Sequence, residues 1–551
     1  MNQYVIGTDY GTLSARTVLV EVSSGNTVAE AVFPYPHAVM DEALPCGKKL
    51  PPHYALQHPS DYTEALRVTI PQVLAAGKVR PDQVVGMGVD FTACTLIPLD
   101  QKGDPLCFSP EYESNPHAYV KLWKHHAAQR EADEINALAA KRGEPWLNRY
   151  GRKISCEWAL PKILQVLRED PALYENTARF SEAADWLSLV LTGEETHSAA
   201  FAGYKALWSD KDGYPSNDFF AALDPRLSGI VGTKLSENVL GMGQLAGTLS
   251  VEGAALTGLT EGTAVAVPAI DAHAAMPALN LTGSGDLMVI VGTSACHLVN
   301  GDSEVTVEGT CGYVKDGVIP GIYTYEAGQA GVGDIFDWFV KSGLPAAYYE
   351  EAAARKMNLH ALLREKAQGL LPGQSGLLAL DWLSGNRSTL VDSDLTGMIL
   401  GMNLQTKPEE IYRAWIESTA YGLRIIVDQY ERSGVPVKSI CAAGGIALKD
   451  PMMMQIYADV LHRSIHIAGT TQAAALGSAI YAAVAAGVYD DVPSAAKALS
   501  ASCVKTYEPN AEKGVVYDAL YREYATLYDY FGRENSVMKT LGALRKSASE
   551  N

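Results

Sequence analysis

The sequence predicts an α/β protein with mixed sheets and two large domains. Its 551 residues exceed the usual size of one hydrophobic core, so two domains are expected. Strand-like and helix-like runs alternate along the chain, which is typical of layered α/β folds. A strand, a Gly-Thr turn and a second strand occur at residues 4–22 and again at 286–301. This similarity predicts a duplicated fold with facing hairpins.

The elements of the first half follow from local patterns. Residues 4–22 read as two strands around the turn Gly-Thr-Asp-Tyr-Gly-Thr, and residues 84–100 as a strand, a polar loop and a strand. Helical spacing is present at 118–143 and at 159–170, where Pro171 ends the second helix. A glycine-rich passage follows at 238–250. We place the domain boundary there, between residues 1–245 and 246–551.

The second half begins the same pattern again. Residues 264–280 predict a strand that runs into an Asp-bearing turn and a helix of small residues. Residues 286–301 predict a second hairpin. The longest uncharged stretch, 470–489, is rich in Ala and Gly and falls short of a membrane span. It therefore predicts a buried helix.

Composition excludes some partners. The chain is 47% hydrophobic and carries a formal net charge of -19, which argues against nucleic acid or an anionic membrane as the main partner. A small local site can still bind a phosphorylated ligand. The eight cysteines form no CxxC pair, so reduced thiols in a cytoplasmic protein are expected rather than a zinc site. No basic and apolar leader pattern precedes the strand at Tyr4.

The first hairpin has the residues of a phosphate site. Glycines let backbone N–H groups approach an anion, and threonine hydroxyls add donors. An aspartate there would repel bare phosphate unless Mg²⁺ lies between them, held through water. Asp9, Gly11 and Thr12 therefore predict a metal-phosphate cradle, and the alternative is a tight hairpin that Asp9 only caps. P-loop, Rossmann and protein-kinase signatures are absent from the sequence.

Three longer segments carry a resemblance to a known family. They are "VLGMGQLAGTLSVEGAALTGLTEGTAVAVPAIDAHA", "GMILGMNLQTKPEEIYRAWIE" and "ICAAGGIALKDPMMMQIYADVL". With the two hairpins they resemble the FGGY carbohydrate kinases, although Trp415 stands where a smaller residue is usual. The resemblance implies two actin-like (ribonuclease H-like) domains around an interdomain cleft. Residues 1–245 would bind the sugar and residues 246–551 the nucleotide, with ATP and Mg²⁺ as cofactors.

Shorter segments point to one branch of that family. "GVDFTACT", "KLWKHHAAQ", "AGYKALW" and "MQIYADV" resemble the bacterial L-ribulokinases. This implies phosphorylation of L-ribulose, or of other 2-ketopentoses, at the 5-hydroxyl in L-arabinose breakdown. Another kinase of the family, acting on xylulose, ribitol or glycerol, stays open, as does an ATPase switch of the actin or chaperone type. The expected partners are a ketopentose and ATP, with a homodimer as the expected assembly.

The resemblance also assigns roles at matching positions. Asp271 would take the proton of the attacking sugar hydroxyl, and its alternative role is to cap the following helix. In the nucleotide site, Gly292 and Thr293 would form the hairpin that faces Gly11 and Thr12. Other nucleotide-binding candidates follow later in the chain, and they are Gln329, Gly444, Gly445 and Lys449.

The sugar pocket is expected to face Asp271. Ala93 would leave room for the ketose, and Trp123 would pack its ring on a sugar face unless it is a core residue. Lys205 is predicted to bind a hydroxyl or phosphate, with a surface lysine as the alternative. Glu326 would hold a sugar hydroxyl, and a structural ion pair is its alternative.

Overall fold

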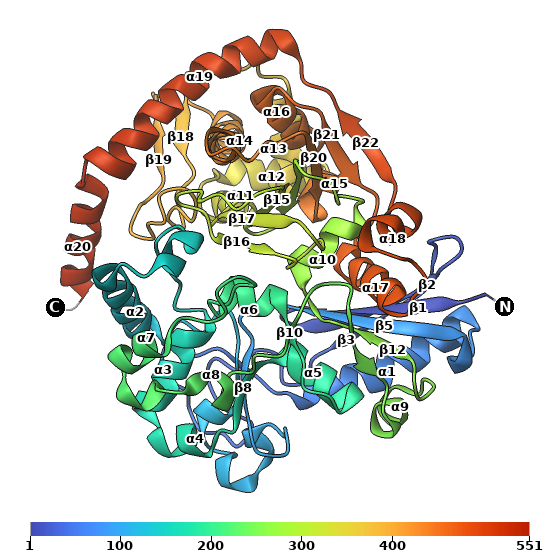
Figure 1. Ribbon diagram of the computed structural model, residues 1–551. Helices are drawn as coiled ribbons and strands as arrows, with labels where there is room; N and C mark the ends of the chain where they lie inside the picture. The colour runs from blue at the N-terminus through green and yellow to red at the C-terminus, as the bar shows by residue number, and fades with distance from the viewer. Residues whose placement is uncertain (1, 550–551) are drawn as a thin grey trace.

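The protein consists of two α/β units, stacked one above the other in Figure 1. The computed structural model describes residues 2–549. The blue and green parts of the chain form most of the lower unit, and the yellow and orange parts form most of the upper unit. Each unit is built on a seven-stranded sheet. Buried apolar side chains form a core at each of these sheets and a third core beneath a smaller sheet.

The sheet of the lower unit begins with the chain's first three strands. Its order is β3–β2–β1–β5–β12–β11, and the short strand β13 also pairs with β5. In chain order these strands are Tyr4–Tyr10 (β1), Ser14–Glu21 (β2), Thr27–Pro34 (β3), Val84–Phe91 (β5), Leu245–Thr248 (β11), Ala264–Ala266 (β12) and Ala269–Ile270 (β13).

The sheet of the upper unit has the order β16–β17–β15–β14–β20–β21–β22. In chain order these strands are Asp286–Val291 (β14), Ala295–Gly301 (β15), Gly312–Lys315 (β16), Tyr323–Gln329 (β17), Ser439–Ala443 (β20), Ile465–Ala468 (β21) and Cys503–Tyr507 (β22).

The two sheets repeat one pattern of pairing. In the first, β3, β2 and β1 are antiparallel, β5 and β12 continue parallel to β1, and β11 closes the edge antiparallel. In the second, β17, β15 and β14 are antiparallel, β20 and β21 are parallel to β14, and β22 is again antiparallel. The hairpins β1–β2 and β14–β15 therefore occupy equivalent places. The duplication predicted from the sequence is confirmed.

The predicted domain boundary falls at the first residue of β11. Strand β11 begins at residue 245, β12 and β13 follow it, and all three belong to the first sheet. The chain therefore completes the lower sheet before it begins the upper one at β14.

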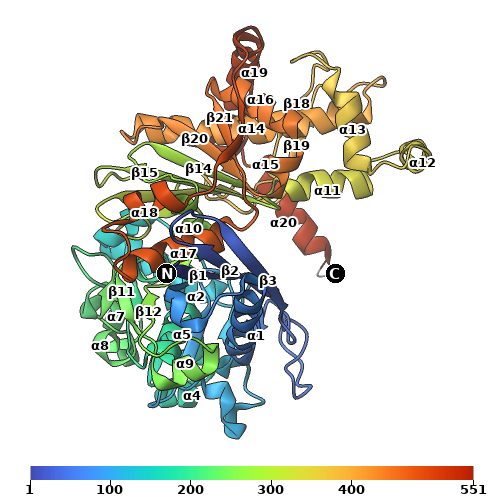
Figure 2. The ribbon, with the colours of Figure 1, turned by 90° about the vertical axis from the view of Figure 1, so that its right-hand side faces the viewer.

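A helix from late in the chain covers the first sheet. Helix α17 (Ala473–Ala485) packs against β1 and β5, and Figure 2 shows it, in red, beside the blue strands. A Cβ on Gly7 would lie 1.8 Å from the carbonyl oxygen of Ala475, and one on Gly88 would lie 2.3 Å from that of Ser478. Glycine at these two strand positions therefore lets helix α17 approach the sheet closely. The small residues of 470–489 form a buried helix, as predicted.

A four-stranded sheet sits beside the first one and corrects one prediction. Its order is β4–β7–β6–β8, and its strands are Leu56–Gln57 (β4), Leu96–Leu99 (β6), Val120–Lys121 (β7) and Arg179–Glu182 (β8). The helix expected over 118–143 is wrong for 118–128, because that segment pairs with β4 and β6 and then turns. Helix α2 begins only at Gln129. The strand–loop–strand at 84–100 and the helix ended by Pro171 are confirmed.

The remaining elements connect and cover the sheets. Two short sheets pair β9 (His197–Ser198) with β10 (Val239–Leu240) and β18 (Leu378–Leu380) with β19 (Met398–Leu400). The helices up to β13 are Ser60–Gly77 (α1), Gln129–Arg142 (α2), Ala159–Glu169 (α3), Pro171–Asn176 (α4), Ala183–Thr192 (α5), Ala199–Lys205 (α6), Asn217–Leu223 (α7), Ile230–Thr233 (α8) and Val251–Thr257 (α9). The later helices, with α17, are Asp271–Ala278 (α10), Gly333–Ser342 (α11), Ala346–Ala354 (α12), Leu359–Gln368 (α13), Pro408–Arg432 (α14), Gly445–Lys449 (α15), Pro451–Leu461 (α16), Val492–Leu499 (α18), Ala511–Asp529 (α19) and Val537–Ser549 (α20). Within residues 2–549, no helix combines the length and the apolar character needed to cross a membrane.

Candidate active site

Three aspartates meet at one edge of the first sheet. Asp9 lies in β1 directly opposite Asp90 in β5, and β13 runs parallel to β5 with Ala269 opposite Asp90. Asp271 follows β13 and begins α10. Because the carboxyl ends of parallel strands lie at the same edge of a sheet, the fold brings all three carboxyl groups together.

Burial and mutual repulsion set the protonation of this cluster. Burial, and then the charge of Asp9, raise the pKa of Asp90 well above its usual value, which favours its protonated form. Burial also raises the pKa of Asp9, against the lowering effects of Asp90 and Arg16. Burial, and then the charge of Asp9, raise the pKa of Asp271 to about 7. Asp271 can therefore take up a proton near neutral pH, as a general base requires.

One oxygen of the cluster has no protein partner. Asp90 Oδ2 accepts a hydrogen bond of 2.6 Å from the hydroxyl of Ser478, whereas the buried Asp90 Oδ1 has none. Among residues 2–549, no three His, Cys, Asp or Glu side chains come together as a ready-made metal site. The donor set at this edge is thus a pair of neighbouring carboxyl groups with one free buried oxygen.

The first Gly-Thr turn lies beside this cluster. Gly11 donates its N–H to the carbonyl of Ser14 at 3.1 Å, and Asp9 pairs with Arg16 at 3.1 Å. The Thr12 hydroxyl accepts a hydrogen bond of 3.2 Å from the indole N–H of Trp123. The turn is therefore held in place by contacts on both sides.

The second Gly-Thr turn is held by the start of α11. Val332 donates its N–H to the carbonyl of Thr293 at 2.8 Å, and Gly333 donates to the carbonyl of Gly292 at 3.0 Å. Thr293 itself is exposed. The hydrogen bonds from Val332 and Gly333 hold the turn in place, while Thr293 is exposed to solvent.

The predicted sugar residues Lys205 and Glu326 meet across the two units. Lys205, at the end of α6, forms an ion pair of 3.0 Å with Glu326 on β17, and both side chains are buried. Glu326 is also 3.1 Å from Arg387 and 3.6 Å from His273. Lys205, His273 and Arg387 therefore keep the pKa of Glu326 well below its usual value, although burial alone would raise it. The buried ion pair excludes the surface-lysine alternative for Lys205.

Ala93 and Trp123 lie on neighbouring turns of the lower unit. Ala93 is the one residue of 91–95 that keeps partial exposure. Trp123 is 37% exposed and lies on the turn after β7, not on a helix. The core-tryptophan alternative for Trp123 is therefore wrong.

The predicted nucleotide residues divide into open and packed positions. A Cβ on Gly444 would lie 2.5 Å from the carbonyl oxygen of Val291, whereas one on Gly445 would meet nothing within 4 Å. Gly444 also has φ +96°. Gly444 is thus required by packing and Gly445 leaves an open surface. Lys449, at the end of α15, is exposed.

Gln329 lies inside the upper unit. Its amide nitrogen donates to Asp381 at 3.0 Å and to the carbonyl of Thr419 at 2.9 Å, and its oxygen lies 3.1 Å from His297 Nε2. Since these contacts use the amide within the core, the geometry favours a structural role over a direct contact with nucleotide.

One residue of the site lay outside the sequence prediction of the pocket. Arg387 lies in an irregular segment with no local signal, and its role emerges only from its contact with Glu326. Strand register, in turn, places Asp90 beside Asp9.

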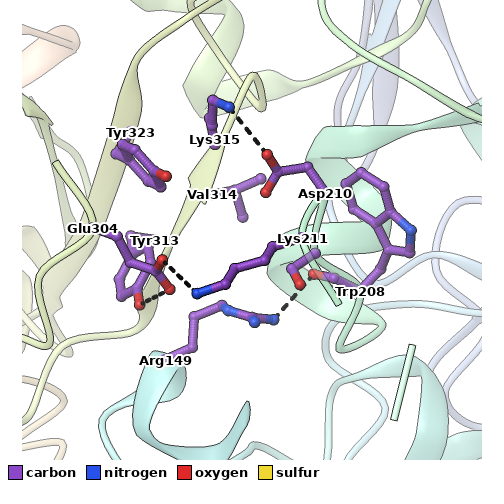
Figure 3. A pocket seen from close by; sticks show the side chains of 10 residues that line it. Arg149, Trp208, Asp210, Lys211, Glu304, Tyr313, Val314, Lys315 and Tyr323 are labelled. Atoms are coloured by element: carbon purple, nitrogen blue, oxygen red, sulfur yellow. Dashed lines mark hydrogen bonds and ion pairs between the residues drawn. The ribbon is translucent and has the colours of Figure 1, made fainter. Parts of the chain in front are cut away.

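A separate pocket marks the junction of the two units (Figure 3). Lys315 on β16 pairs with Asp210 at 3.2 Å, and Lys211 pairs with Glu304 at 3.9 Å. The side chain of Arg149 also lines this pocket. None of the predicted catalytic, sugar or nucleotide residues lines it. These exposed pairs contribute little stability each and connect the units away from Asp271.

Comparisons with known proteins agree with this geometry. The N-terminal domain of the FGGY family of carbohydrate kinases matches residues 4–277, and its C-terminal domain matches residues 287–486. A ribulokinase of Bacillus licheniformis is 51% identical over 542 residues, covering 98% of each chain. A ribulokinase of Shouchella clausii is 51% identical over 554 residues, covering 100% of this chain and 99% of the other. The crystal structure of xylulose kinase from Rhodospirillum rubrum shares the fold, with a TM-score of 0.79 at 23% identity over 96% of this chain and 98% of that one.

Proposed function

The chain belongs to the FGGY family of carbohydrate kinases, and from this premise we propose that it acts as an L-ribulokinase. The reaction is transfer of the γ-phosphoryl group of ATP to the 5-hydroxyl of L-ribulose, which gives L-ribulose 5-phosphate and ADP. The observation that carries this proposal is the identity of about 51% with curated ribulokinases along the whole chain. A place in L-arabinose breakdown follows from that substrate.

Asp271 is proposed to act as the general base. Its raised pKa matches the task, because a base works best when its pKa lies near the operating pH. The 5-hydroxyl oxygen forms a bond to the γ-phosphorus while the bond from that phosphorus to the β,γ-bridging oxygen breaks. The hydroxyl proton passes to Asp271.

Lys205 and Glu326 are proposed to bind sugar hydroxyls beside this base. Both contribute to the electrostatic environment of Asp271, which supports their closeness to the reacting atoms. Ala93 leaves space on the lower unit, and Trp123 offers an exposed ring. Approach of the two units with sugar bound would exclude water and limit wasteful ATP hydrolysis.

ATP is proposed to lie between the two Gly-Thr turns and Gly445. The turns Gly11–Thr12 and Gly292–Thr293 would place donors on the phosphates, while Gly445 and the exposed Lys449 would border the nucleoside.

The residues beside the first turn fit a divalent cation. Asp9 and Asp90 are neighbouring carboxyl groups, and the buried Asp90 Oδ1 accepts no hydrogen bond. A cation there would offset the charge of Asp9 that, after burial, raises the pKa of Asp90. Asp9 would hold Mg²⁺ through water. Mg²⁺ bound there would neutralise charge on the phosphate oxygens.

ADP release from MgATP tests the proposal. It is measured with each 2-ketopentose, with ribitol, with glycerol and without sugar. We expect strong dependence on L-ribulose. A clear preference for xylulose, ribitol or glycerol would identify another activity of the family. Equal release without any sugar would instead support an ATPase switch and remove the sugar-pocket assignments.

The cellular compartment of the enzyme is proposed from its cysteines and its phosphoryl donor. All eight cysteines are free, which suits a reducing compartment, and ATP is abundant in the cytoplasm. We therefore propose a cytoplasmic enzyme. The homodimer stays a prediction, and size-exclusion chromatography with light scattering tests it.

A further inference from the structure

A buried lysine holds together the two turns that carry Ala93 and Trp123. Lys162, on α3, is fully buried. Its Nζ donates to the carbonyl oxygens of Cys94 at 2.5 Å, Leu122 at 3.0 Å and Lys121 at 3.3 Å. An ammonium group has three donors, so all three are used on backbone carbonyls.

These carbonyls belong to the neighbours of the predicted sugar residues. Cys94 follows Ala93, and Leu122 precedes Trp123. Cys94 also has φ +63°, a conformation that a residue with a side chain adopts only when its surroundings hold it. The hydrogen bond from Lys162 to its carbonyl is one such restraint.

A buried glutamate holds the same loop from the other side. Glu182, at the end of β8, is 6% exposed, and its Oε2 accepts the backbone N–H of Thr95 at 2.6 Å. The charges of Lys162 and Glu182 stabilise one another, although neither touches the other directly. The Ala93 loop is therefore fixed through its carbonyl by a cation and through its N–H by an acid.

Strand register explains why both turns are within reach of one side chain. In the four-stranded sheet, Leu96 of β6 lies opposite Lys121 of β7 on one side and Glu182 of β8 on the other. The loop before β6 and the turn after β7 consequently leave the sheet at the same edge.

Packing alone does not explain why the charged side chain of Lys162 is buried at this position. Burying an ammonium group without a bonded carboxylate costs several kcal/mol before its hydrogen bonds are counted, and an apolar side chain would avoid that cost. What an apolar side chain cannot do is bind three carbonyls from two separate segments. The feature therefore points to a requirement for fixed geometry in those segments.

We propose that Lys162 and Glu182 are positioning residues that fix the Ala93 loop against the Trp123 turn, and so set the affinity of the pocket for its ketopentose. The inference rests on the proposed function, because it takes these two turns to border the sugar. Neither residue contacts the sugar itself. Each acts through the backbone that carries Ala93 or Trp123.

The test compares Lys162→Met with Lys121→Met. Methionine keeps the length of the side chain and removes its donors. Lys121 is an equally buried lysine that donates only to the carbonyl of His117, at 3.4 Å, and so controls for the loss of a buried charge. We expect Lys162→Met to raise the KM for the sugar about tenfold or more, with kcat within about threefold and the KM for ATP unchanged. The Lys121→Met variant should keep the wild-type KM for the sugar.

A second pair of variants covers the case in which Lys162→Met does not fold. Glu182→Gln keeps an oxygen that can accept the Thr95 N–H, whereas Glu182→Leu removes it. We expect Glu182→Leu to raise the KM for the sugar and Glu182→Gln to stay near the wild type. An unchanged sugar KM in folded Lys162→Met or Glu182→Leu would overturn the proposal, as would equal effects of the two lysine variants on every kinetic constant.

The wild-type enzyme separates this inference from the proposed function. If it prefers a sugar other than L-ribulose, the substrate assignment fails, and the four variants are assayed with that preferred sugar. If it prefers L-ribulose and the variants keep its KM, only the positioning role fails.

Discussion

Replacing Asp271 by Asn should have opposite effects on turnover and on stability. Asn keeps the shape of the side chain, and its oxygen can still accept the N–H of Ala272, which lies 2.6 Å from Asp271 Oδ1. It cannot take a proton from the sugar hydroxyl. Loss of a general base lowers kcat by about 10²- to 10⁴-fold. Binding of sugar and nucleotide should change much less, because Asn preserves the hydrogen-bonding surface.

The stability effect follows from the raised pKa of Asp271. Between about pH 4 and pH 7 the folded protein binds a proton at Asp271 that the unfolded chain has released, so folding stability falls as pH rises through this range. The shift from 3.8 to about 7 corresponds to about 4 kcal/mol at most when the group is ionised. Asp271 keeps some contact with solvent, so we expect about half of this. Asp271→Asn should therefore stabilise the protein by about 2 kcal/mol at pH 8 and by about 1 kcal/mol or less at pH 5, where the unfolded chain has already released its proton.

The measurements are steady-state ADP release with L-ribulose and urea unfolding of the free protein at pH 5 and pH 8. The comparison at pH 5 is the internal control, since the folded wild type then keeps its proton and the stabilisation by Asn should be less than half of that at pH 8. Turnover within tenfold of the wild type would refute the role as base. A variant less stable than the wild type at pH 8 would refute the electrostatic reasoning.

Four further variants test other parts of the site. Asp9→Asn should lower the pH of the acidic limb in the pH profile of kcat/KM, which is expected near pH 7 in the wild type, because the charge of Asp9 raises the pKa of Asp271. An acidic limb at an unchanged pH would contradict this reasoning. Gly444→Ala should lower thermal stability, because Gly444 has φ +96° and a Cβ there would meet the Val291 backbone. Gly445→Ala should fold normally and raise the KM for ATP. Equal stability of the two variants by calorimetry would contradict the assignment of Gly444 to packing and Gly445 to an open surface. Glu326→Gln leaves a buried ammonium group on α6 without its carboxylate, and should lower the free energy of unfolding in urea by about 3 kcal/mol; a change under about 1 kcal/mol shows that the ion pair is dispensable.

Local patterns were sufficient for the parts of the site that lie in turns. Asp9 stands out because it lies near a strand end among glycines and threonines, whereas Asp271 is selected mainly by the family resemblance, and both roles stay predictions. The small-residue helix α17 was also recognisable, since only Ala, Gly and Ser allow a helix to approach β1 and β5 so closely.

Contacts between distant segments were beyond such patterns. Residues 118–128 have helical spacing, but pairing with β4 and β6 overrides it, and that pairing depends on strands more than twenty residues away. The position of Asp90 beside Asp9 follows from strand register, which the local sequence does not show. Arg387 and Lys162 carry no local signal at all, because their importance lies in the partners that the fold brings to them.

The arrangement around Glu326 would let a neutral sugar bind at the proposed site without leaving a buried charge unpaired. Glu326 takes one of the three donors of Lys205 and is held as well by Arg387 and His273. Lys205 has no other hydrogen-bond acceptor within the described residues, so two of its donors are available to sugar hydroxyls. The ion pair between the units can therefore persist while sugar binds. In the proposed sugar site, the same pair of side chains would bind the sugar and connect the two units.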